Sequence, residues 1–358
     1  MKPEYASFDS LDKFNAIMSI IAKRLIEHPN AVCSYSGGSD SDTMLDLIER
    51  TRSIFNLPPI QYAFFNTGLE LDATKRHVRE QEKRYGITIT EYRPKINIVQ
   101  AVRKYGVPFY TKMFSSRLAL WQRYKIPLSI IHAILSMDSD SAKSAIIGIK
   151  ERYKCPDGLI RFLIPCSKDG RMINIDQSHL LSAPYMIDFL AIYPPDFAIS
   201  SKCCDCCKKE IAHTVLSDYD MIITGERESE GGVRTISFSK YNSVGCFRET
   251  VDHKYRLRPL YYVSDTDKKW YKNHYGLCYS DAYEIYGLKR TGCSGCPINA
   301  NVVQDLERIK QYEPNIVTAS WNIFGDSYRY RIAYNEYKRK RQLQVKSRNT
   351  ISYIQDGE

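Results

Sequence analysis

The sequence predicts an α/β protein with a doubly wound, mostly parallel sheet, a helical insertion and a helical C-terminal tail. Three short apolar segments, residues 31–33, 60–65 and 87–92, alternate with segments whose apolar residues recur at helical spacing. Such alternation is typical of a parallel sheet with helices on both faces. A glycine pair, residues 37 and 38, lies shortly after the first apolar segment. Sheets of this class bind their ligands there, beyond the carboxyl ends of the strands.

Periodicity, proline and glycine predict the remaining elements. Helices are expected at residues 11–27, 43–54 and 70–85, a further strand at residues 221–223, and a helical tail after Pro297. Residues 115–154 are mostly helical in pattern, and Pro127 predicts a break within them. Residues 155–174 hold two prolines and two glycines, which indicates a hairpin or a loop insertion.

The composition is that of a globular protein with a basic surface. The chain carries 51 Lys and Arg against 41 Asp and Glu, a formal net charge of +10. This balance favours polyanionic partners such as nucleotides or nucleic acid, and the alternative is a solvated basic surface with no specific partner. No apolar stretch approaches the roughly 20 residues that span a bilayer, and the N-terminus lacks a secretory pattern. We therefore expect a cytoplasmic protein with no membrane partner.

Residues 36–41 read Ser-Gly-Gly-Ser-Asp-Ser and lie between an expected strand and an expected helix. The two glycines lack a Cβ, so the backbone can turn sharply and its N–H groups can approach an oxyanion. The start of the helix adds its positive end, and the serines add hydroxyl donors. We interpret the loop as a phosphate site rather than a glycine-rich turn with a serine cap. Its expected nucleotide ligands are Ser36, Gly37, Gly38, Ser39 and Ser41, and Asp40 is assigned a catalytic role in positioning a metal, with helix capping as its alternative.

The loop lacks the Gly-Lys-[Ser/Thr] of a Walker A motif and instead resembles the PP-loop of the adenine-nucleotide α-hydrolase superfamily. That superfamily includes ATP pyrophosphatases, tRNA thiolation enzymes and the phosphoadenylyl-sulfate (PAPS) reductase family. Residues 65–70 resemble the Asp-Thr-Gly segment of the last family, with Asn66 in place of its Asp. Residues 224–230 resemble its Thr-Gly-x-Arg-x-x-Glu segment. The resemblance implies a PP-loop fold and nucleotide contacts from Thr67, Gly68 and Gly225.

Arg227, in the second of these segments, is assigned a catalytic role beside Asp40. Its planar guanidinium can hold phosphate or sulfate through two hydrogen bonds. The alternative is a surface salt bridge to Glu228 or Glu230, and Arg234 is a weaker second candidate.

Many ATP-using relatives carry Lys at the fourth position of the loop, where this chain has Ser39. The positive charge that neutralises the phosphates is then expected from Arg227, from a loop lysine such as Lys240, or from a bound Mg²⁺. This difference leaves open whether the adenine nucleotide is ATP, PAPS or adenylyl-sulfate.

The cysteines are crowded at two places. A chain with 11 cysteines and no export signal does not indicate a disulfide framework, and crowded thiols in a reducing compartment indicate a metal. Four thiolates suit an iron–sulfur cluster or zinc. A structural Zn²⁺ is the alternative, followed by unliganded buried cysteines. The crowded cysteines are Cys203, Cys204, Cys206 and Cys207, and the pair Cys293 and Cys296.

Residues 200–209 resemble the family segment Cys-Cys-Asp-x-Leu-Lys-Lys, and residues 286–297 resemble its Gly-Leu-x-Arg-x-Gly-Cys-x-x-Cys-Pro segment. In the adenylyl-sulfate reductases and their relatives, such a Cys-Cys pair and a distant Cys-x-x-Cys hold a 4Fe–4S cluster. The resemblance therefore implies a 4Fe–4S cluster on four metal ligands, which are Cys203, Cys204, Cys293 and Cys296.

These motifs predict one nucleotide-binding domain, residues 1–299, followed by a basic helical extension, residues 300–358. The insertion is expected at about residues 110–200. The metal-site segments are residues 200–210 and 286–297.

Conventional reductases of the family attack the sulfate with a cysteine near the C-terminus, and no cysteine follows Cys296 in this chain. We therefore expect an enzyme that binds ATP, adenylates a substrate with release of pyrophosphate, and uses its cluster in sulfur transfer or redox. DNA phosphorothioation and tRNA thiolation enzymes are the models for such an adenylating enzyme. One alternative is a sulfonucleotide reductase with an unusual nucleophile.

A second alternative is a nucleotide-binding or nucleic-acid-binding module whose metal site is structural. Residues 328–341 mix tyrosines with Lys and Arg, as surfaces that bind nucleic-acid strands do. The same pattern fits a solvated helical face. The sequence leaves open the acceptor substrate, the oligomeric state and any partner protein.

Overall fold

The computed structural model describes residues 3–164, 166, 185–230, 246–250 and 254–355, and the side chains of the last eleven of these are not described. Arg234 and Lys240 lie outside the described residues. The chain forms two compact units. Residues 1–98, 204–294 and 304–318 form the first, here called the sheet unit, and residues 99–203, 295–303 and 319–358 form the second, here called the helical unit.

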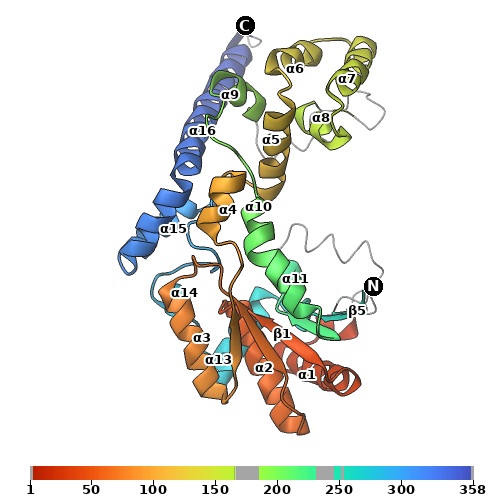
Figure 1. The fold of residues 1–358 in the computed structure, drawn as a ribbon, viewed down its shortest axis with the longest axis vertical. Coiled ribbons are helices and arrows are strands. Elements are labelled where there is room, and N and C mark those ends of the chain that lie inside the picture. The colour runs from red at the N-terminus through yellow and green to blue at the C-terminus, as the bar shows by residue number, and fades with distance from the viewer. Residues whose placement is uncertain (1–2, 165, 167–184, 231–245, 251–253, 356–358) are drawn as a thin grey trace. The chain divides into compact units, whose positions relative to one another are not determined.

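The sheet unit contains a six-stranded sheet in the order β3-β2-β1-β4-β6-β5 (Figure 1). Every neighbouring pair is parallel except β5 and β6, so the predicted doubly wound, mostly parallel sheet is confirmed. The chain adds strands on one side of β1 and then on the other, which places a topological switch point between β1 and β4. The strands are β1 Ala31–Tyr35, β2 Gln61–Phe65, β3 Ile89–Tyr92, β4 Met221–Thr224, β5 Phe247–Glu249 and β6 Tyr255–Leu257.

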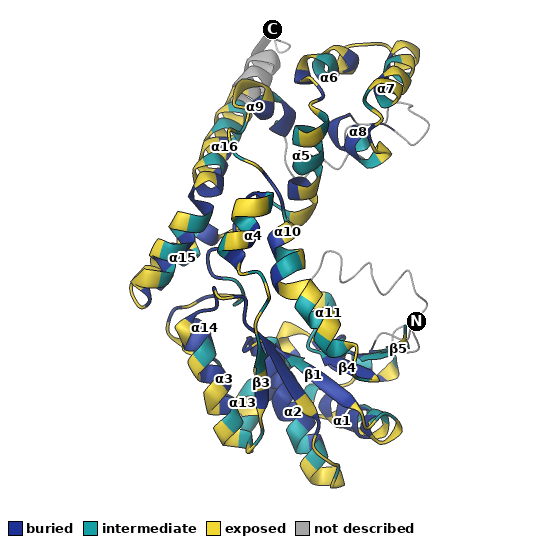
Figure 2. Cartoon of the chain, viewed as in Figure 1, coloured by how far each residue is buried: buried dark blue, intermediate teal, exposed yellow. Residues whose placement is uncertain are grey.

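Strand β1 is buried on both faces, as its short apolar sequence predicts. Alternate residues point to opposite faces, so Cys33 and Tyr35 enter one core while Val32 enters another. The first core is shared with side chains of α1 Ser10–Glu27, α2 Ser39–Phe55, α3 Asp72–Tyr85 and α13 Asp265–Tyr275. The second is shared with α11 Glu210–Leu216. Figure 2 shows the buried faces of these strands and helices.

The helical unit is built around an aromatic core of Phe114, Phe162, Phe189 and Tyr334. The break predicted at Pro127 is confirmed, since this residue is the N-cap of α6. The unit contains α5 Lys112–Tyr124, α6 Leu128–Leu135, α7 Ser139–Tyr153, α8 Asp157–Leu163, α9 Met186–Ile192, most of α4 Ile98–Tyr105 and most of α16 Pro314–Gln355. The predicted helical tail is confirmed by α15 Val302–Lys310 and by α16.

One expectation for the insertion was wrong. Residues 157–163, where a hairpin or loop was expected, form the helix α8. Pro156 is its N-cap, a position where the missing N–H of proline costs nothing, and four of the seven helical residues are buried. Tertiary burial therefore outweighs the local turn signals, and most of residues 165–174 lie outside the described ranges.

Helix α2 begins at Ser39, four residues before the expected start at Thr43, so half of the glycine loop belongs to the helix. The short elements are α10 Lys202–Cys204, a π-helical turn Asp205–Lys209, α14 Asp281–Glu284 and the 3₁₀ turns Glu4–Ser7 and Glu228–Glu230. Among the described residues, no helix is both long enough and apolar enough to cross a membrane.

Candidate functional site

The loop after β1 is held in shape by its own serine. Gly37 has φ +66°, and a Cβ added there would lie 2.7 Å from Thr74 Cγ2. The Ser41 hydroxyl accepts a hydrogen bond from the Gly38 N–H (2.9 Å) and donates one to the Gly38 carbonyl (2.7 Å). Ser41 therefore closes the first turn of α2 in this structure, whereas the sequence alone suggested a free donor to phosphate.

A cavity of about 490 Å³ in the sheet unit opens over this loop, beside the ends of β1 and β4. Its lining includes the predicted residues Ser36, Gly38, Ser39, Asp40, Ser41, Gly225 and Arg227, whereas Gly37 does not line it. It also includes five basic residues, which are Lys208, Arg227, Lys268, Lys289 and Arg290. Four acidic residues also line it, so basic residues outnumber acidic ones by one. A concave site with several cations at the switch point of a parallel sheet suits an anionic nucleotide.

Two cations hold the Asp40 carboxylate. Its Oδ1 lies 2.9 Å from Arg227 Nε and 2.7 Å from Lys268 Nζ. Arg227 is buried and pairs also with Asp265 at 2.8 Å, so it does not form the surface salt bridge to Glu228 or Glu230. Burial lowers the pKa of the Arg227 guanidinium, but its carboxylate partners outweigh burial and raise that pKa.

Lys268 was not among the residues predicted from the sequence. It lies on α13, more than 220 residues after the loop, and its Nζ donates to Ser39 Oγ (3.0 Å) as well as to Asp40. No local motif surrounds it, because Lys268-Lys269 follows an ordinary capping box of Ser264 and Asp267. Only the packing of α13 against α2 brings this lysine to the loop.

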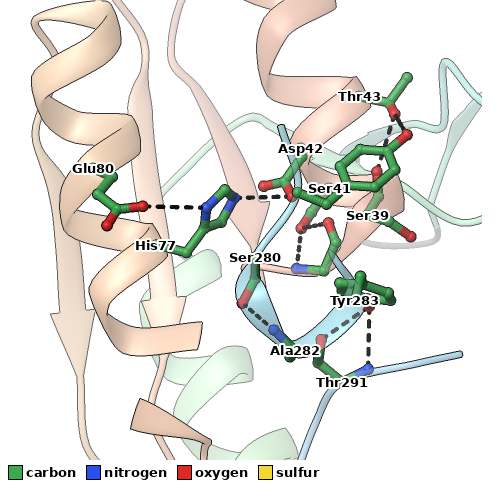
Figure 3. A network of polar contacts seen from close by, with 12 residues as sticks. Ser39, Ser41, Asp42, Thr43, His77, Glu80, Ser280, Ala282, Tyr283 and Thr291 are labelled. Carbon is green, nitrogen blue, oxygen red and sulfur yellow. Dashed lines mark hydrogen bonds and ion pairs between the residues drawn. The ribbon is translucent and has the colours of Figure 1, made fainter. Parts of the chain in front are cut away.

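Tyr283 and Thr291 form a second polar wall of the cavity. The Thr291 N–H donates to the Tyr283 hydroxyl at 3.1 Å, and the two hydroxyls lie 3.1 Å apart (Figure 3). A Cβ added at Gly38 would meet Tyr283 Oη, Ser36 Oγ and Thr291 Oγ1 at 3.2–3.3 Å. Gly38 is therefore needed for close approach rather than for φ, since its φ is −94°.

Behind the loop, a buried histidine faces α2. His77 Nε2 lies 3.0 Å from Asp42 Oδ2, and His77 Nδ1 lies 3.7 Å from Glu80 (Figure 3). Asp42 also accepts a hydrogen bond from Tyr35. Burial lowers the pKa of His77. The hydrogen bond to Asp42 and the nearby acidic groups raise it by more than burial lowers it, so the net pKa lies above its ordinary value.

The structure does not bring Thr67 and Gly68 to the cavity over the glycine loop. They line a separate cavity of about 340 Å³. Their N–H groups bond to Glu70 (2.8 and 3.2 Å), and Thr67 Oγ1 lies 3.3 Å from Cys293 Sγ. Glu70 itself does line the cavity over the loop, and burial raises its pKa. Glu70 was not among the site residues predicted from the sequence.

The four predicted metal ligands fall in both units. Cys204 and Cys293 belong to the sheet unit, while Cys203 and Cys296 belong to the helical unit. Within the described part of the chain, no three His, Cys, Asp or Glu side chains gather as a metal site. The Cys-Cys pair starts a helix that continues through a π-helical turn, a rare form that is frequent at functional sites.

A family profile described as "Phosphoadenosine phosphosulfate reductase domain" matches residues 30–139. The match covers less than a third of the chain and is a likeness of this segment to that family. The matched segment begins just before β1 and includes the glycine loop and β2, whose motifs resemble that family. No curated protein matches the sequence.

Two solved structures are similar to the chain. One is a PAPS reductase from Candida auris in complex with phosphate, at 14% identity and a TM-score of 0.37, covering 77% of this chain and 87% of that one. The other is the U34-tRNA thiolase NcsA from Methanococcus maripaludis with its [4Fe-4S] cluster. It has 11% identity and a TM-score of 0.32, covering 89% of this chain and 80% of that one.

Proposed function

We propose that this chain is a PP-loop enzyme that binds ATP in the cavity over the glycine loop and transfers its adenylyl group to an acceptor. The observation that carries the proposal is the cavity itself, at the switch point of the sheet. The loop backbone, the three serines of the loop and five basic side chains line it. Backbone N–H groups at a helix start together with lysine and arginine are a general solution for holding phosphates.

In the proposed reaction, a nucleophilic atom of the acceptor forms a bond to the α-phosphorus of ATP. The bond from that phosphorus to the bridging oxygen breaks, and pyrophosphate leaves with the electron pair. Arg227 and Lys268 lie beside the loop, where positive charge stabilises the negative charge that develops on the leaving group. Glu70 is a candidate base for the acceptor, because burial raises its pKa towards neutral pH.

We also propose that Cys203, Cys204, Cys293 and Cys296 hold a 4Fe–4S cluster, with structural zinc as the alternative. The chemistry of four thiolates supports this, and a cluster would supply sulfur transfer or electron transfer. Among the described residues these cysteines do not gather as a ligand group, and the adenylyl transfer does not depend on the cluster.

The test is exchange of labelled pyrophosphate into ATP, measured with candidate acceptors, together with calorimetric titration of ATP. Wild-type protein is expected to bind ATP and to catalyse exchange once the acceptor is present. Absence of ATP binding combined with binding of PAPS would contradict the proposal and favour the alternative of a sulfonucleotide reductase.

The reductase alternative needs a thiolate at the sulfate. None of the 11 cysteines is among the described residues that line the cavity. Cys207 is buried, and burial with the neighbouring Cys206 raises its pKa to about 11, so its thiol is protonated at neutral pH. Burial also raises the pKa of Cys246. These observations support adenylyl transfer over sulfonucleotide reduction.

A second candidate function, binding of nucleic acid, is favoured by the distribution of charge between the two units. The sheet unit has 29 Lys and Arg against 29 Asp and Glu, whereas the helical unit has 22 against 12. The whole net charge of +10 therefore belongs to the helical unit. Along α16, Arg339 and Lys340 are exposed, and their neighbours Lys338 and Arg341 are half-buried. A basic surface of this kind suits a nucleic-acid acceptor.

Filter binding of tRNA and of duplex DNA at several salt concentrations tests this second candidate. A variant with residues 338–341 changed to Ala is expected to bind more weakly and to show a shallower dependence on salt, since each lost phosphate contact removes about 0.9 from the slope. Replacing Lys23, Lys75, Arg76 and Arg79, exposed cations of the sheet unit, is the matched control. Equal effects of the two sets would contradict a specific surface on the helical unit.

A further inference from the structure

The glycine loop has no positive charge of its own. Residues 36–41 contain one ionisable side chain, Asp40, and it is an acid. Phosphates that enter such a loop need cations from elsewhere in the fold, because the backbone and hydroxyl donors supply only partial charge.

Lys268 lies where such a cation is needed. Its Nζ contacts Ser39 Oγ at 3.0 Å and Asp40 Oδ1 at 2.7 Å, so it sits over the first turn of α2. It lines the cavity, and its side chain is 17% exposed. An ammonium group has three N–H donors, and these two contacts use two of them. The third is left for a ligand in the cavity.

The helix that carries Lys268 is firmly anchored. The preceding residue, Asp267, accepts a bond from Ser264 that caps α13, and it forms an ion pair with Lys13 of α1 at 2.7 Å. The side chains of Lys13 and Asp267 are each 8% exposed. Tyr271, one turn later, donates to Asp46 of α2 at 2.7 Å. These contacts fix the position of Lys268 relative to the loop before any ligand binds.

Arg227 cannot take this role by itself. Its guanidinium is shared between Asp40, Asp265, the Ser229 hydroxyl and the Val263 carbonyl. These partners engage four of its five N–H donors, and its side chain is only 6% exposed. Lys268 has fewer partners and faces the cavity.

We propose that Lys268 is the phosphate-binding lysine of this site, supplied by α13 rather than by the loop, and that it holds the terminal phosphates of the nucleotide. This inference rests on the proposed function and adds to it. It assigns the charge that the loop lacks to one residue and predicts selectivity for di- and triphosphates over a monophosphate.

Calorimetric titration of ATP and AMP with Lys268→Met tests the assignment. Met keeps the length of the side chain and removes the charge. ATP affinity is expected to fall about ten-fold to a hundred-fold, as loss of a charged hydrogen bond implies, with AMP affinity little changed. The matched control is Lys269→Met, the exposed neighbour on the same helix, which is expected to bind both like wild type. Unfolding curves of both variants check that the fold is kept.

The double variant Asp40→Asn/Lys268→Met distinguishes phosphate binding by Lys268 from neutralisation of Asp40 by Lys268. If Lys268 served only to neutralise Asp40, removing both charges would restore ATP affinity. If Lys268 binds phosphate, the double variant stays weak. Restored affinity, or equal ATP affinity of Lys268→Met and wild type, would overturn the assignment and leave the proposed function standing. Wild-type protein that binds neither ATP nor inorganic pyrophosphate would overturn both.

Discussion

His77 Nε2 lies 3.0 Å from Asp42 Oδ2 behind the phosphate loop, and each side chain is less than 5% exposed. The pair joins α3 to the first turn of α2, the turn that carries Ser39 and Asp40. Its ionisation state therefore affects both the stability of the sheet unit and the geometry of the loop.

This pair predicts a fall in stability as pH rises. The folded-state pKa of His77 is raised, so protonated His77 stabilises the fold below its unfolded value of about 6.5, and this stabilisation is lost as pH rises through the folded pKa. Acidic groups on three helices, α2, α3 and α14, favour protonated His77. They are Asp42, Glu80, Asp281 and Glu284. Urea unfolding between pH 6 and pH 9 measures the effect.

His77→Gln is expected to flatten that pH dependence, because glutamine cannot titrate. The control is His213→Gln, an exposed histidine of α11, which is expected to keep the wild-type profile. A His77→Gln profile as steep as that of wild type would show that other groups cause the change.

Gly38→Val is expected to abolish nucleotide binding, with affinity reduced by more than about 100-fold, while the free energy of unfolding changes by about 1 kcal/mol or less. The added side chain would occupy the space between Ser36, Tyr283 and Thr291, where phosphate must approach the backbone. Equilibrium dialysis with ATP and thermal unfolding measure the two quantities. Gly148→Val in α7, where an added Cβ meets no heavy atom within 4 Å, is the control and should bind normally.

The buried ion pair of Lys13 and Asp267 predicts a large loss of stability when one partner is removed. Lys13→Met leaves Asp267 buried without its cation, which costs about 3 kcal/mol or more in the free energy of unfolding. Burial raises the pKa of Asp267, but hydrogen bonds from Lys13 and Ser264 lower it by a larger amount, so the net pKa lies below its ordinary value. The stabilisation is therefore present above the ordinary pKa of Asp and is lost as pH falls through the folded value.

Urea titrations of Lys13→Met and of the double variant Lys13→Met/Asp267→Asn test this point. The double variant should regain part of the loss, since no charge then stays buried alone. If the two variants are equally unstable, the ion pair is not the cause.

The proposed cluster predicts colour and iron in protein purified without oxygen. Cys203→Ser and Cys293→Ser are expected to lose iron and to unfold more readily, because metal ligation contributes folding free energy. Cys278→Ser, an exposed cysteine outside the proposed ligand set, is the control and should keep its iron. Stoichiometric zinc without iron in the anaerobic protein would favour the structural zinc site instead.

Adenylyl transfer predicts that PAPS and adenylyl-sulfate release no sulfite when thioredoxin is supplied. The physical reason is that no cysteine lines the described part of the cavity. Sulfite production that disappears in a single variant of Cys206, Cys207, Cys246 or Cys278 would identify an unusual nucleophile and return the chain to the reductases. Ion chromatography of sulfite, with each of these cysteines changed to Ser in turn, distinguishes the outcomes.

The sequence by itself determined the features that depend on neighbouring residues. Short apolar runs at residues 31–33 and 60–65 predicted β1 and β2, and helical spacing predicted α1 and α3 within two residues. The glycine pair predicted the loop, since Gly37 adopts a backbone conformation that other residues avoid. Local propensity and hydrophobic period are sufficient for such features.

Only the tertiary structure decided which side chains meet at the loop. Lys268 and Tyr283 come from segments more than 220 residues later, and nothing near them in the sequence marks them as neighbours of the loop. Thr67 was expected at the nucleotide, but its hydroxyl donates to Glu70 and lies 3.3 Å from Cys293 Sγ. Contacts between distant segments depend on how helices pack on the sheet, and a single sequence does not encode that packing in any local pattern.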